Sequence, residues 1–394
     1  MHKPIIIIGS SIAGISAAEA VRRQDAGVDI LILTQDLFEP YYRLRICEVL
    51  DNQAVSSQLA LHPVQWYEDR KIKFETGVTV TGILPDKHQV RLADGRSMDF
   101  ERLVIASGSK SFVPNVAGVG RPGVRTLWTM QNALDISQAL DKASCVAVIG
   151  GGLLGLEAAY HVRRQGLATT VIEKAPRLLV NQLDEAGSEI LKARVLNLGV
   201  GVVTAADVVE ITGPAADPES PAAGVRLSDG REFPADLVLI SIGVQANTGL
   251  LEGSGIDVRR RITTDYRMRT SSQDIYAAGD VAEPDGYWFG LWSVSRLQGQ
   301  VAGTNAAGGD AVFDKAIPPY IINTMETRVA VQGDKGQLSE PQYELDVMFD
   351  PDSGNYSKLI YRDGIFSGFM LVGDSPDFAR LQKQIGKPGP VRLG

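Results

Sequence analysis

The chain has 394 residues, of which 44% are hydrophobic and 22% charged, and its formal net charge is −8. This length exceeds one ordinary hydrophobic core and predicts two or three domains of a globular protein. The negative charge argues against general binding of nucleic acids or anionic membranes. No apolar run approaches the ~18 residues of a membrane span, and the N-terminus does not have the pattern of a secretory signal. Two cysteines without a CxxC motif indicate a reducing cytoplasm and exclude a cysteine-ligated iron–sulfur site within the chain.

The first elements in chain order form a strand–helix–strand pattern around a glycine-rich corner. Residues 5–8 predict a buried parallel strand, residues 10–23 a helix of small residues, and residues 29–34 the next strand. A crossing rich in Pro, Tyr and Arg then leads to a helical region near residues 47–50. Further strands are predicted, between turn signals such as DGR, at residues 78–80, 89–92 and 103–106.

The same pattern restarts near residue 146. It predicts a strand at 146–149, a helix at 153–165, and strands at 169–173 and 237–242, with a surface excursion at 212–224. The segment TSSQDIYAAGD, residues 270–280, precedes a Trp-rich loop and a helix of small residues. From about residue 317, alternating strand-like segments and a closing helix near residues 378–385 predict a small α+β unit.

The first glycine-rich corner, IIIIGSSIAGISAAEA, has the form of a dinucleotide-binding fingerprint. Gly9 is expected to make the tight turn, Ser11 replaces the second glycine and allows close backbone approach, and Gly14 lets the helix pack on its strand. Thr34 stands at the end of the second strand, where an acidic ribose ligand is expected. Either Thr34 or Asp36, two residues later, is therefore expected to bind the ribose.

The second corner, VAVIGGGLLGLEAAY, fits the GxGxxG fingerprint fully through Gly150, Gly152 and Gly155, with Leu154 in the same turn. Glu173 closes the following strand, where a carboxylate binds the adenosine ribose and repels the extra phosphate of NADPH. NADH is therefore favoured over NADPH. Two fingerprints in one chain predict two dinucleotides held face to face, with FAD on the first and the nicotinamide cofactor on the second.

The order of these segments resembles that of the pyridine-nucleotide/FAD reductases of the glutathione-reductase-like superfamily, and within it the NADH:rubredoxin and flavorubredoxin reductases. The resemblance covers nearly the whole chain. It implies an α/β fold with two Rossmann-like dinucleotide-binding domains and a small α+β C-terminal domain. The FAD domain would be discontinuous, comprising residues 1–110 and 246–314. The NAD domain would be inserted at residues 111–245, and residues 315–394 would form the C-terminal domain.

The resemblance also assigns further residues to the two cofactors. Asp280, at the end of the IYAAGD segment, would bind the ribityl chain of FAD. The stretch LVIASGSK resembles the superfamily's Ala-Thr-Gly turn, with Ser107 in place of threonine and Gly108 beside the dinucleotide. Glu157 matches the superfamily glutamate that lies near the contact between nicotinamide and flavin. The remaining cofactor contacts expected from these segments are Val80, Ala106, Val281 and Gly243.

Cys47 lies in the segment YYRLRICEVL and leaves two functions open. NADH oxidases, peroxidases and coenzyme A disulfide reductases of the superfamily keep a redox cysteine in this region, and a thiol at a helix N-terminus would have a lowered pKa. The neighbours of Cys47 instead resemble the Tyr-Tyr-Arg segment of rubredoxin reductases, where no cysteine is required. Arg43 and Arg45 are then expected near the flavin, where a cation stabilises the anionic reduced ring. Cys145 is expected to be structural, and the four scattered histidines have no metal-ligand spacing.

The expected reaction is hydride transfer from NADH to FAD, followed by transfer of single electrons to rubredoxin or another small iron–sulfur protein. Residues 259–261 (RRR) are a candidate contact for an acidic acceptor, or alternatively a solvated turn. Trp288 and Trp292 are candidates for shielding the flavin, for docking the acceptor, or for plain packing. The alternative functions are an oxidase, peroxidase or coenzyme A disulfide reductase acting through Cys47, and a redox-sensing binding protein resembling the apoptosis-inducing factors.

Overall fold

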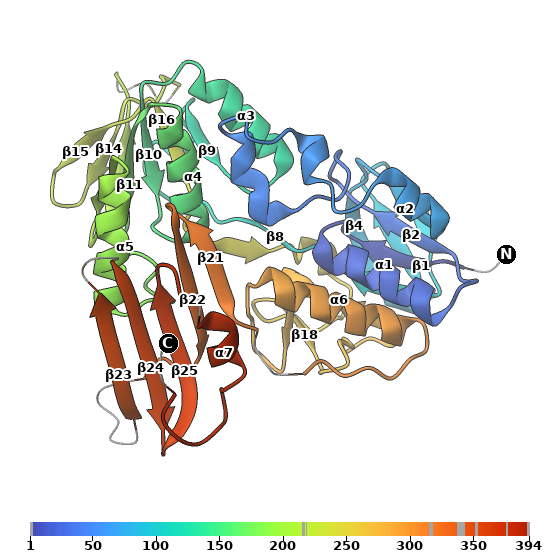
Figure 1. The fold of residues 1–394 in the computed structure, drawn as a ribbon. Coiled ribbons are helices and arrows are strands. Elements are labelled where there is room, and N and C mark those ends of the chain that lie inside the picture. The colour runs from blue at the N-terminus through green and yellow to red at the C-terminus, as the bar shows by residue number, and fades with distance from the viewer. Residues whose placement is uncertain are drawn as a thin grey trace.

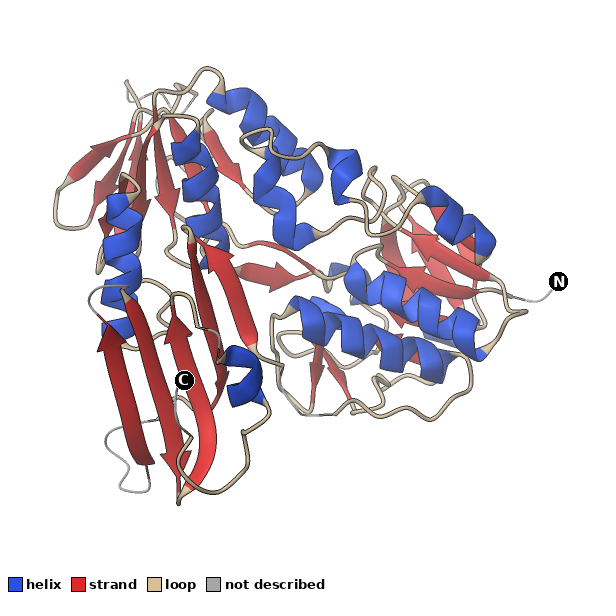
Figure 2. Cartoon of the chain, viewed as in Figure 1, coloured by secondary structure: helices blue, strands red, loops and turns tan. Residues whose placement is uncertain are grey.

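Three five-stranded sheets organise the chain, two of them parallel and one antiparallel (Figures 1 and 2). The computed structural model describes residues 3–214, 217, 219–314, 318–336, 343–350, 354–375 and 377–391. Helices flank the two parallel sheets, and the antiparallel sheet near the C-terminus lies against the second of them. Within this described part, no helix combines the length and the apolarity that crossing a membrane requires.

The first parallel sheet combines strands from distant parts of the chain. Its strand order is β19 (Ile275–Ala277), β7 (Arg102–Ile105), β1 (Ile5–Ile8), β2 (Ile30–Leu33) and β3 (Ile72–Glu75). In β1, Ile5 and Ile7 belong to the hydrophobic core on one face of the sheet, and the two alternate isoleucines belong to the core on the other face. This two-sided burial explains the uninterrupted apolar run.

Helices α1 (Ile12–Gln24) and α6 (Trp292–Ala306) pack side by side over this sheet (Figure 1). Their backbones approach closely because α6 has glycine at two positions one turn apart. A Cβ atom at Gly299 would lie 2.2 Å from the carbonyl oxygen of Ala13, and one at Gly303 would lie 2.2 Å from that of Ala17. Glycine is therefore required at both positions for this helix pair to form.

The second parallel sheet is built from one continuous part of the chain. Its strand order is β12 (Val200–Val203), β11 (Ala168–Ile172), β10 (Cys145–Ile149), β16 (Leu237–Ile240) and β9 (Val124–Thr126). Its helices are α3 (Met130–Leu140), α4 (Leu153–Arg164) and α5 (Glu185–Asn197). A separate small antiparallel sheet shares a hydrophobic core with it and consists of β13 (Val208–Thr212), β14 (Gly224–Leu227) and β15 (Glu232–Pro234). The excursion predicted at residues 212–224 is the β13–β14 connection, of which residues 215, 216 and 218 lie outside the described part.

Shorter elements complete the region of the first sheet and connect it to the second. The strands β8 (Ser109–Ser111) and β17 (Val244–Ala246) form an antiparallel pair where the chain passes between the two parallel sheets (Figure 1). The others are the 3-10 helices Arg43–Val49 and Ser56–Leu59, α2 (Val64–Asp69), β4 (Val80–Leu84), β5 (Gln89–Leu92), β6 (Ser97–Asp99), β18 (Ile262–Thr264) and β20 (Ala282–Pro284).

The antiparallel sheet packs on helices of the second parallel sheet. Its strand order is β21 (Tyr320–Thr324), β22 (Thr327–Gly333), β25 (Ile365–Val372), β24 (Asn355–Arg362) and β23 (Tyr343–Asp350), followed by α7 (Phe378–Gln382). Asp184, which caps the N-terminus of α5, accepts hydrogen bonds from the Tyr356 hydroxyl at 2.8 Å and from Lys358 Nζ at 3.1 Å. The Lys358 side chain is only 7% exposed, so this contact joins the two sheets through a largely buried charge pair.

Several predicted elements have different bounds in the structure; for example, the closing helix predicted near residues 378–385 ends at Gln382 and the strand predicted at 237–242 ends at Ile240. The strand predicted at residues 78–80 is wrong, because the strand begins at Val80 and the Val78 N–H donates to the carbonyl of Thr34 instead. The helical region predicted near residues 47–50 is a 3-10 helix, Arg43–Val49, that starts and ends earlier.

Candidate functional site

The first glycine corner joins β1 to α1 with no room for side chains at two positions. Gly9 has a φ of +106°, and a Cβ atom there would lie 2.2 Å from the carbonyl oxygen of Ala106. A Cβ atom at Gly14 would lie 1.9 Å from the carbonyl oxygen of Gly9. Ser11 is the N-cap residue of α1, and its side chain makes no capping hydrogen bond. The corner therefore presents backbone N–H groups of the first helical turn.

The second glycine corner repeats this geometry between β10 and α4. Gly150 has a φ of +118°, and its Cβ would lie 2.2 Å from the carbonyl oxygen of Ser241. A Cβ at Gly155 would lie 2.1 Å from the carbonyl oxygen of Gly150. Gly152 differs, because apart from its immediate chain neighbours no atom lies within 4 Å of the position its Cβ would take. The missing side chain at Gly152 leaves open space beside the helix N-terminus, where the half-buried Leu154 also lies.

The capping of the two corner helices differs from that of α3 and α5 and matches that of α2, α6 and α7, which also lack a side-chain cap. Thr129 caps α3 by accepting a hydrogen bond from the N–H of Asn132, and Asp184 caps α5 by accepting one from the N–H of Gly187. The helices α1 and α4 have no side-chain cap. Their first-turn N–H groups are donors without a capping partner, and a helix N-terminus of this kind suits a pyrophosphate.

Glu173 lies against the second corner. One of its carboxylate oxygens accepts a hydrogen bond from the N–H of Gly151, and the other accepts one from the N–H of Ala175 at 2.6 Å. The neighbouring cations are engaged elsewhere, since Lys174 pairs with a surface aspartate at 3.0 Å and Arg177 donates to a backbone carbonyl at 3.1 Å. The corner is therefore bordered by a fixed negative charge.

At the end of β2, Thr34 rather than Asp36 borders the first corner. The buried Thr34 hydroxyl accepts hydrogen bonds from the Ser10 hydroxyl at 3.0 Å and from the N–H of Asp36 at 3.2 Å. The Asp36 carboxylate accepts from the N–H of Phe38 and from the Tyr41 hydroxyl, each at 3.2 Å. Ser10, which the sequence analysis did not identify, lies between Gly9 and Ser11 in the first corner. Its hydrogen bond to Thr34 joins the end of β1 to the end of β2.

Asp280 lies in a hydrogen-bonded cluster near the N-terminus of α6. The Ser109 hydroxyl donates to its carboxylate at 2.8 Å, and Arg261 Nε donates to its backbone carbonyl at 2.8 Å. The Arg261 guanidinium stacks on Trp288, with Cζ 3.8 Å from the ring centroid, and burial lowers its pKa. Arg261 is only 8% exposed, so its expected role in an exposed acceptor contact is wrong, although its two neighbours, residues 259 and 260, are exposed.

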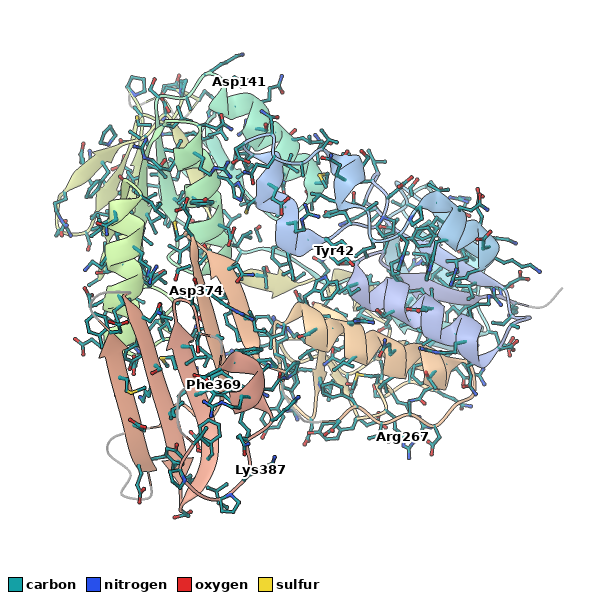
Figure 3. All side chains as sticks on the ribbon, viewed as in Figure 1. Tyr42, Asp141, Arg267, Phe369, Asp374 and Lys387 are labelled. Carbon is teal, nitrogen blue, oxygen red and sulfur yellow. The ribbon has the colours of Figure 1, made fainter. Side chains whose placement is uncertain are left out.

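The Asp280 turn packs against the start of α6. Gly279 donates its N–H to the Gln298 side chain at 2.9 Å. Trp292 Nε1 is buried and has no hydrogen-bond partner among the described residues. The Trp292 ring stacks on Tyr42 at 5.7 Å, so the segment after β2 lies over the N-terminus of α6 (Figure 3).

The LVIASGSK turn connects to the segment that returns from the second sheet. The Ser107 hydroxyl donates to the carbonyl of Asn247 at 3.0 Å, and the Asn247 amide donates back to the carbonyl of Ser107 at 2.8 Å. Gly108 and Gly243 have φ values of +65° and +114°, and neither has an atom within 4 Å of its Cβ position. Val281 is fully buried, so only its backbone is available to a cofactor, whereas Val80 is half-buried.

The 3-10 helix Arg43–Val49 places its three predicted site residues in different environments. Arg43 donates to the carbonyl of Trp128 at 2.9 Å and lies over the Trp128 ring. Arg45 is exposed and paired with Glu48 at 2.6 Å, which compensates its charge. Cys47 is 3% exposed, and burial, together with nearby carboxylates, raises the pKa of its thiol well above the usual value. The environment of Cys47 is thus the opposite of one that activates a thiolate.

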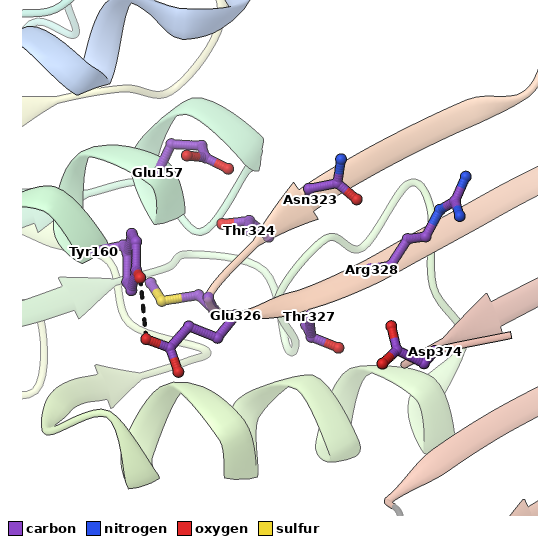
Figure 4. Close-up of a pocket in the computed structure, with 9 residues that line it drawn as sticks. Glu157, Tyr160, Asn323, Thr324, Glu326, Thr327, Arg328 and Asp374 are labelled. Carbon is purple, nitrogen blue, oxygen red and sulfur yellow. Dashed lines mark hydrogen bonds between the residues drawn. The ribbon is translucent and has the colours of Figure 1, made fainter. Parts of the chain in front are cut away.

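Glu157 lines a cleft of about 420 Å³ between α4 and the β21–β22 hairpin (Figure 4). Burial raises the pKa of Glu157 to about 7, and the nearby Glu48 adds to this increase, whereas the Thr324 hydroxyl opposes it. Sequence reasoning did not find two buried neighbours behind it. His161 Nε2 lies 3.8 Å from the Glu157 carboxylate, and His161 Nδ1 lies 3.0 Å from Asp51 Oδ1.

Comparison with known proteins agrees with this geometry. Residues 3–305, which include both glycine corners and Asp280, match the family model described as pyridine nucleotide-disulphide oxidoreductase. A nitric oxide reductase FlRd-NAD(+) reductase from Vibrio vulnificus is 31% identical over 95% of this chain and 95% of its own length. An NADH-rubredoxin oxidoreductase from Clostridium acetobutylicum is 30% identical over 97% of this chain and 94% of its own.

The crystal structure of NADH:rubredoxin oxidoreductase from Clostridium acetobutylicum superposes with a TM-score of 0.81 and 27% identity, covering 99% of this chain and 96% of that one. The expected fold class and the resemblance seen in the sequence are thereby confirmed. Because the family match includes the residues that form both corners, the chain belongs to the pyridine nucleotide-disulphide oxidoreductase family.

Proposed function

We propose that this chain is a cytoplasmic FAD-dependent oxidoreductase that takes hydride from NADH and passes electrons singly to a small redox protein such as rubredoxin. The observation that carries the proposal is the presence of two glycine corners, each followed by a helix without a side-chain cap. Both corners end strands of parallel sheets that the β8–β17 pair connects. Two full-length relatives at 30–31% identity have names that refer to electron transfer between NAD and a rubredoxin-type protein, which supports this choice of acceptor.

The first corner and the α6 region fit FAD. The first-turn N–H groups of α1 are available for a pyrophosphate, and Thr34 borders the place where a ribose would follow. Asp280 and the unpartnered Nε1 of Trp292 offer an acceptor and a donor near α6. When bound, FAD supplies the conversion between a two-electron hydride donor and a one-electron acceptor.

The second corner fits NADH. The N–H groups of α4 would hold its pyrophosphate, and the open space at Gly152 would admit it. The Glu173 carboxylate would accept hydrogen bonds from the adenosine ribose and repel a 2′-phosphate. The role of the protein in hydride transfer is then to orient the two cofactors and exclude water, for which no side chain needs to move a proton.

The domain boundaries follow from the same proposal. Residues 1–110 and 246–314 would bind FAD, residues 111–245 would bind NADH, and residues 315–394 would form the C-terminal domain. The position of β19 beside β7 in the first sheet supports a discontinuous FAD domain, and the continuous second sheet supports an inserted NAD domain.

The test is an anaerobic stopped-flow titration of the purified flavoprotein with NADH or NADPH. The NADH-reduced protein is then mixed with oxidised rubredoxin, coenzyme A disulfide or hydrogen peroxide. Rapid bleaching by NADH, slower bleaching by NADPH, and rapid reoxidation by rubredoxin alone are expected. The Cys47→Ser variant is the matched control, because it removes the thiol that the competing disulfide or peroxide chemistry requires. Reoxidation by a disulfide or peroxide that disappears in this variant would refute the proposal.

A further inference from the structure

Trp288 is a tryptophan that the structure holds in place at the surface. The residue is 44% exposed, whereas the other three tryptophans of the chain are half-buried. Its ring stacks on the Arg261 guanidinium, with Cζ 3.8 Å from the ring centroid, and a Cβ atom at Gly290 would lie 2.8 Å from the ring. A large aromatic side chain that is already fixed loses little freedom when a partner binds, so it is suited to anchor a protein interface.

The loop that carries Trp288 is fixed by backbone hydrogen bonds. The N–H of Gly286 donates to the carbonyl of Glu283 at 3.2 Å. The N–H of Tyr287 donates to the carbonyl of Pro284 at 3.0 Å. Tyr287 is 61% exposed and directly precedes Trp288. The loop therefore presents two neighbouring aromatic side chains to the solvent from a defined backbone.

Two exposed arginines border this loop. Arg259 Nη1 lies 3.5 Å from the position that a Cβ atom of Gly286 would take, and Arg260 follows it in the chain. Within the part of the chain that the structure describes, neither arginine forms an ion pair. The exposed acidic residue of the same loop, Asp285, accepts a hydrogen bond from the Tyr266 hydroxyl at 3.1 Å instead. Both positive charges therefore remain available to a partner.

The contacts beneath Trp288 connect this surface to the candidate flavin site. Arg261 Nε donates to the backbone carbonyl of Asp280 at 2.8 Å, while the same guanidinium supports the exposed ring. Asp280 is the residue expected at the ribityl chain of FAD. One buried side chain thus contacts both the exposed tryptophan and the turn that would hold the flavin, so a carrier bound over Trp288 would lie on the flavin side of the molecule.

We propose that Arg259, Arg260, Tyr287 and Trp288, here called the Trp288 patch, form the surface on which an acidic one-electron carrier protein docks. This inference rests on the proposed function. The net charge of −8 repels an acidic partner from most of the surface, so unpaired arginines determine where such a partner can approach. Electron-transfer encounters use small, weak interfaces, and an aromatic anchor bordered by two cations suits an interface of this kind.

Two carriers visit the patch for each NADH that is oxidised. Each carrier takes one electron, and the proton that remains from the hydride passes to the solvent. The sum is NADH + 2 A(oxidised) → NAD⁺ + 2 A(reduced) + H⁺. The reduced carrier must leave before the next one docks, which a weak interface allows.

Calorimetric titration of the FAD-loaded protein with oxidised rubredoxin tests the patch independently of activity. The double variant Arg259→Glu/Arg260→Glu should raise the Kd about tenfold or more at about 20 mM salt, and much less at about 0.5 M salt, because salt screens exposed charges. The matched control is Arg23→Glu/Arg125→Glu, which makes the same change of charge at two exposed arginines on α1 and β9. This control should bind rubredoxin within about twofold of wild type.

The aromatic anchor is tested in the same titration. Trp288→Ala should raise the Kd about tenfold or more at both salt concentrations, because the lost contact is apolar. Phe349→Ala, which removes an exposed aromatic ring from β23, is the control and should leave the Kd unchanged. Equal affinities in the Arg259→Glu/Arg260→Glu variant and its control would overturn the docking surface, whether or not Trp288→Ala folds, because both arginines are exposed.

Stopped-flow kinetics separate the docking surface from the proposed function. In Arg259→Glu/Arg260→Glu, bleaching of the flavin by NADH should stay within about twofold of wild type, while reoxidation by rubredoxin slows about tenfold or more at low salt. Slow bleaching in this variant would place the defect at the cofactors and count against docking. Reduction of rubredoxin at the wild-type rate by the variant would refute the patch and leave the proposed function standing. A wild-type protein that bleaches but neither binds nor reduces rubredoxin would refute both.

Discussion

Glu157→Gln is expected to stabilise the folded protein in alkaline solution. The pKa of Glu157 is about 7 in the folded state, against an ordinary value of 4.5. Between these values the folded protein retains a proton that the unfolded chain has lost, so stability falls as the pH rises. At about 1.4 kcal/mol per pH unit, ionising the buried carboxyl costs about 3 kcal/mol above pH 8 and less than about 1 kcal/mol at pH 5. Glutamine cannot ionise, and the variant avoids this cost.

Thermal unfolding of wild type and Glu157→Gln with excess FAD, at pH 5 and pH 8.5, measures the effect. A difference of about 3 kcal/mol corresponds to a Tm increase of roughly 6–12 °C for a cooperative unit of about 150–250 residues. Glu326→Gln is the matched control, because Glu326 is an exposed carboxylate on the same cleft. The reasoning is refuted if the Tm difference between Glu157→Gln and wild type is the same at both pH values, or if Glu326→Gln shows an equal rise.

Three further predictions follow from contacts described above. Gly155→Ala is expected to lower the Tm because its Cβ would lie 2.1 Å from a backbone oxygen, whereas Gly152→Ala should keep the Tm and weaken NADH binding about tenfold or more in a fluorescence titration. Equal Tm values for the two glycine variants would contradict this. Cys47→Ser is expected to keep NADH-driven reduction of a one-electron acceptor within about threefold of wild type in steady-state assays, and a hundredfold loss would show that the thiol takes part. Asp184→Ala should lower the free energy of unfolding in urea at pH 7 by about 3 kcal/mol, because Lys358 stays buried without its carboxylate; an unchanged midpoint would argue against that pairing.

The sequence predicted the elements whose signals are local. The strands β1 and β10 were predictable because each is a short, fully apolar run that ends at a glycine corner. Helix α3 also has a readable signal that the sequence analysis did not use, with Thr129 as its cap and apolar residues at helical spacing. Helix α5 is harder to predict, because its buried face includes Gly187 and Ser188, which do not form an apolar stripe.

The site was predictable only where it is continuous in sequence. The glycines of both corners follow from the fingerprint, and the structure gives the steric reason for Gly9 and Gly150. The contact between Ser109 and Asp280 joins residues 171 positions apart, and no spacing rule indicates it. The Asp51–His161 contact was missed for the same reason, because a lone histidine in an apolar helix resembles an ordinary core residue.

The packing of α6 on α1 has a consequence for biosynthesis. Gly303 meets Ala17 only after about three quarters of the 394 residues have been translated, and β19 completes the first sheet at a similarly late point. At about 5–20 residues per second, the ribosome would need roughly 15–60 s to deliver α6 after α1. During this interval the continuous second sheet can fold, while the N-terminal strands lack β19 and α1 lacks α6. The N-terminal segment, whose apolar surfaces stay uncovered longest, is therefore the part of the chain that a chaperone or an early contact with flavin would protect most.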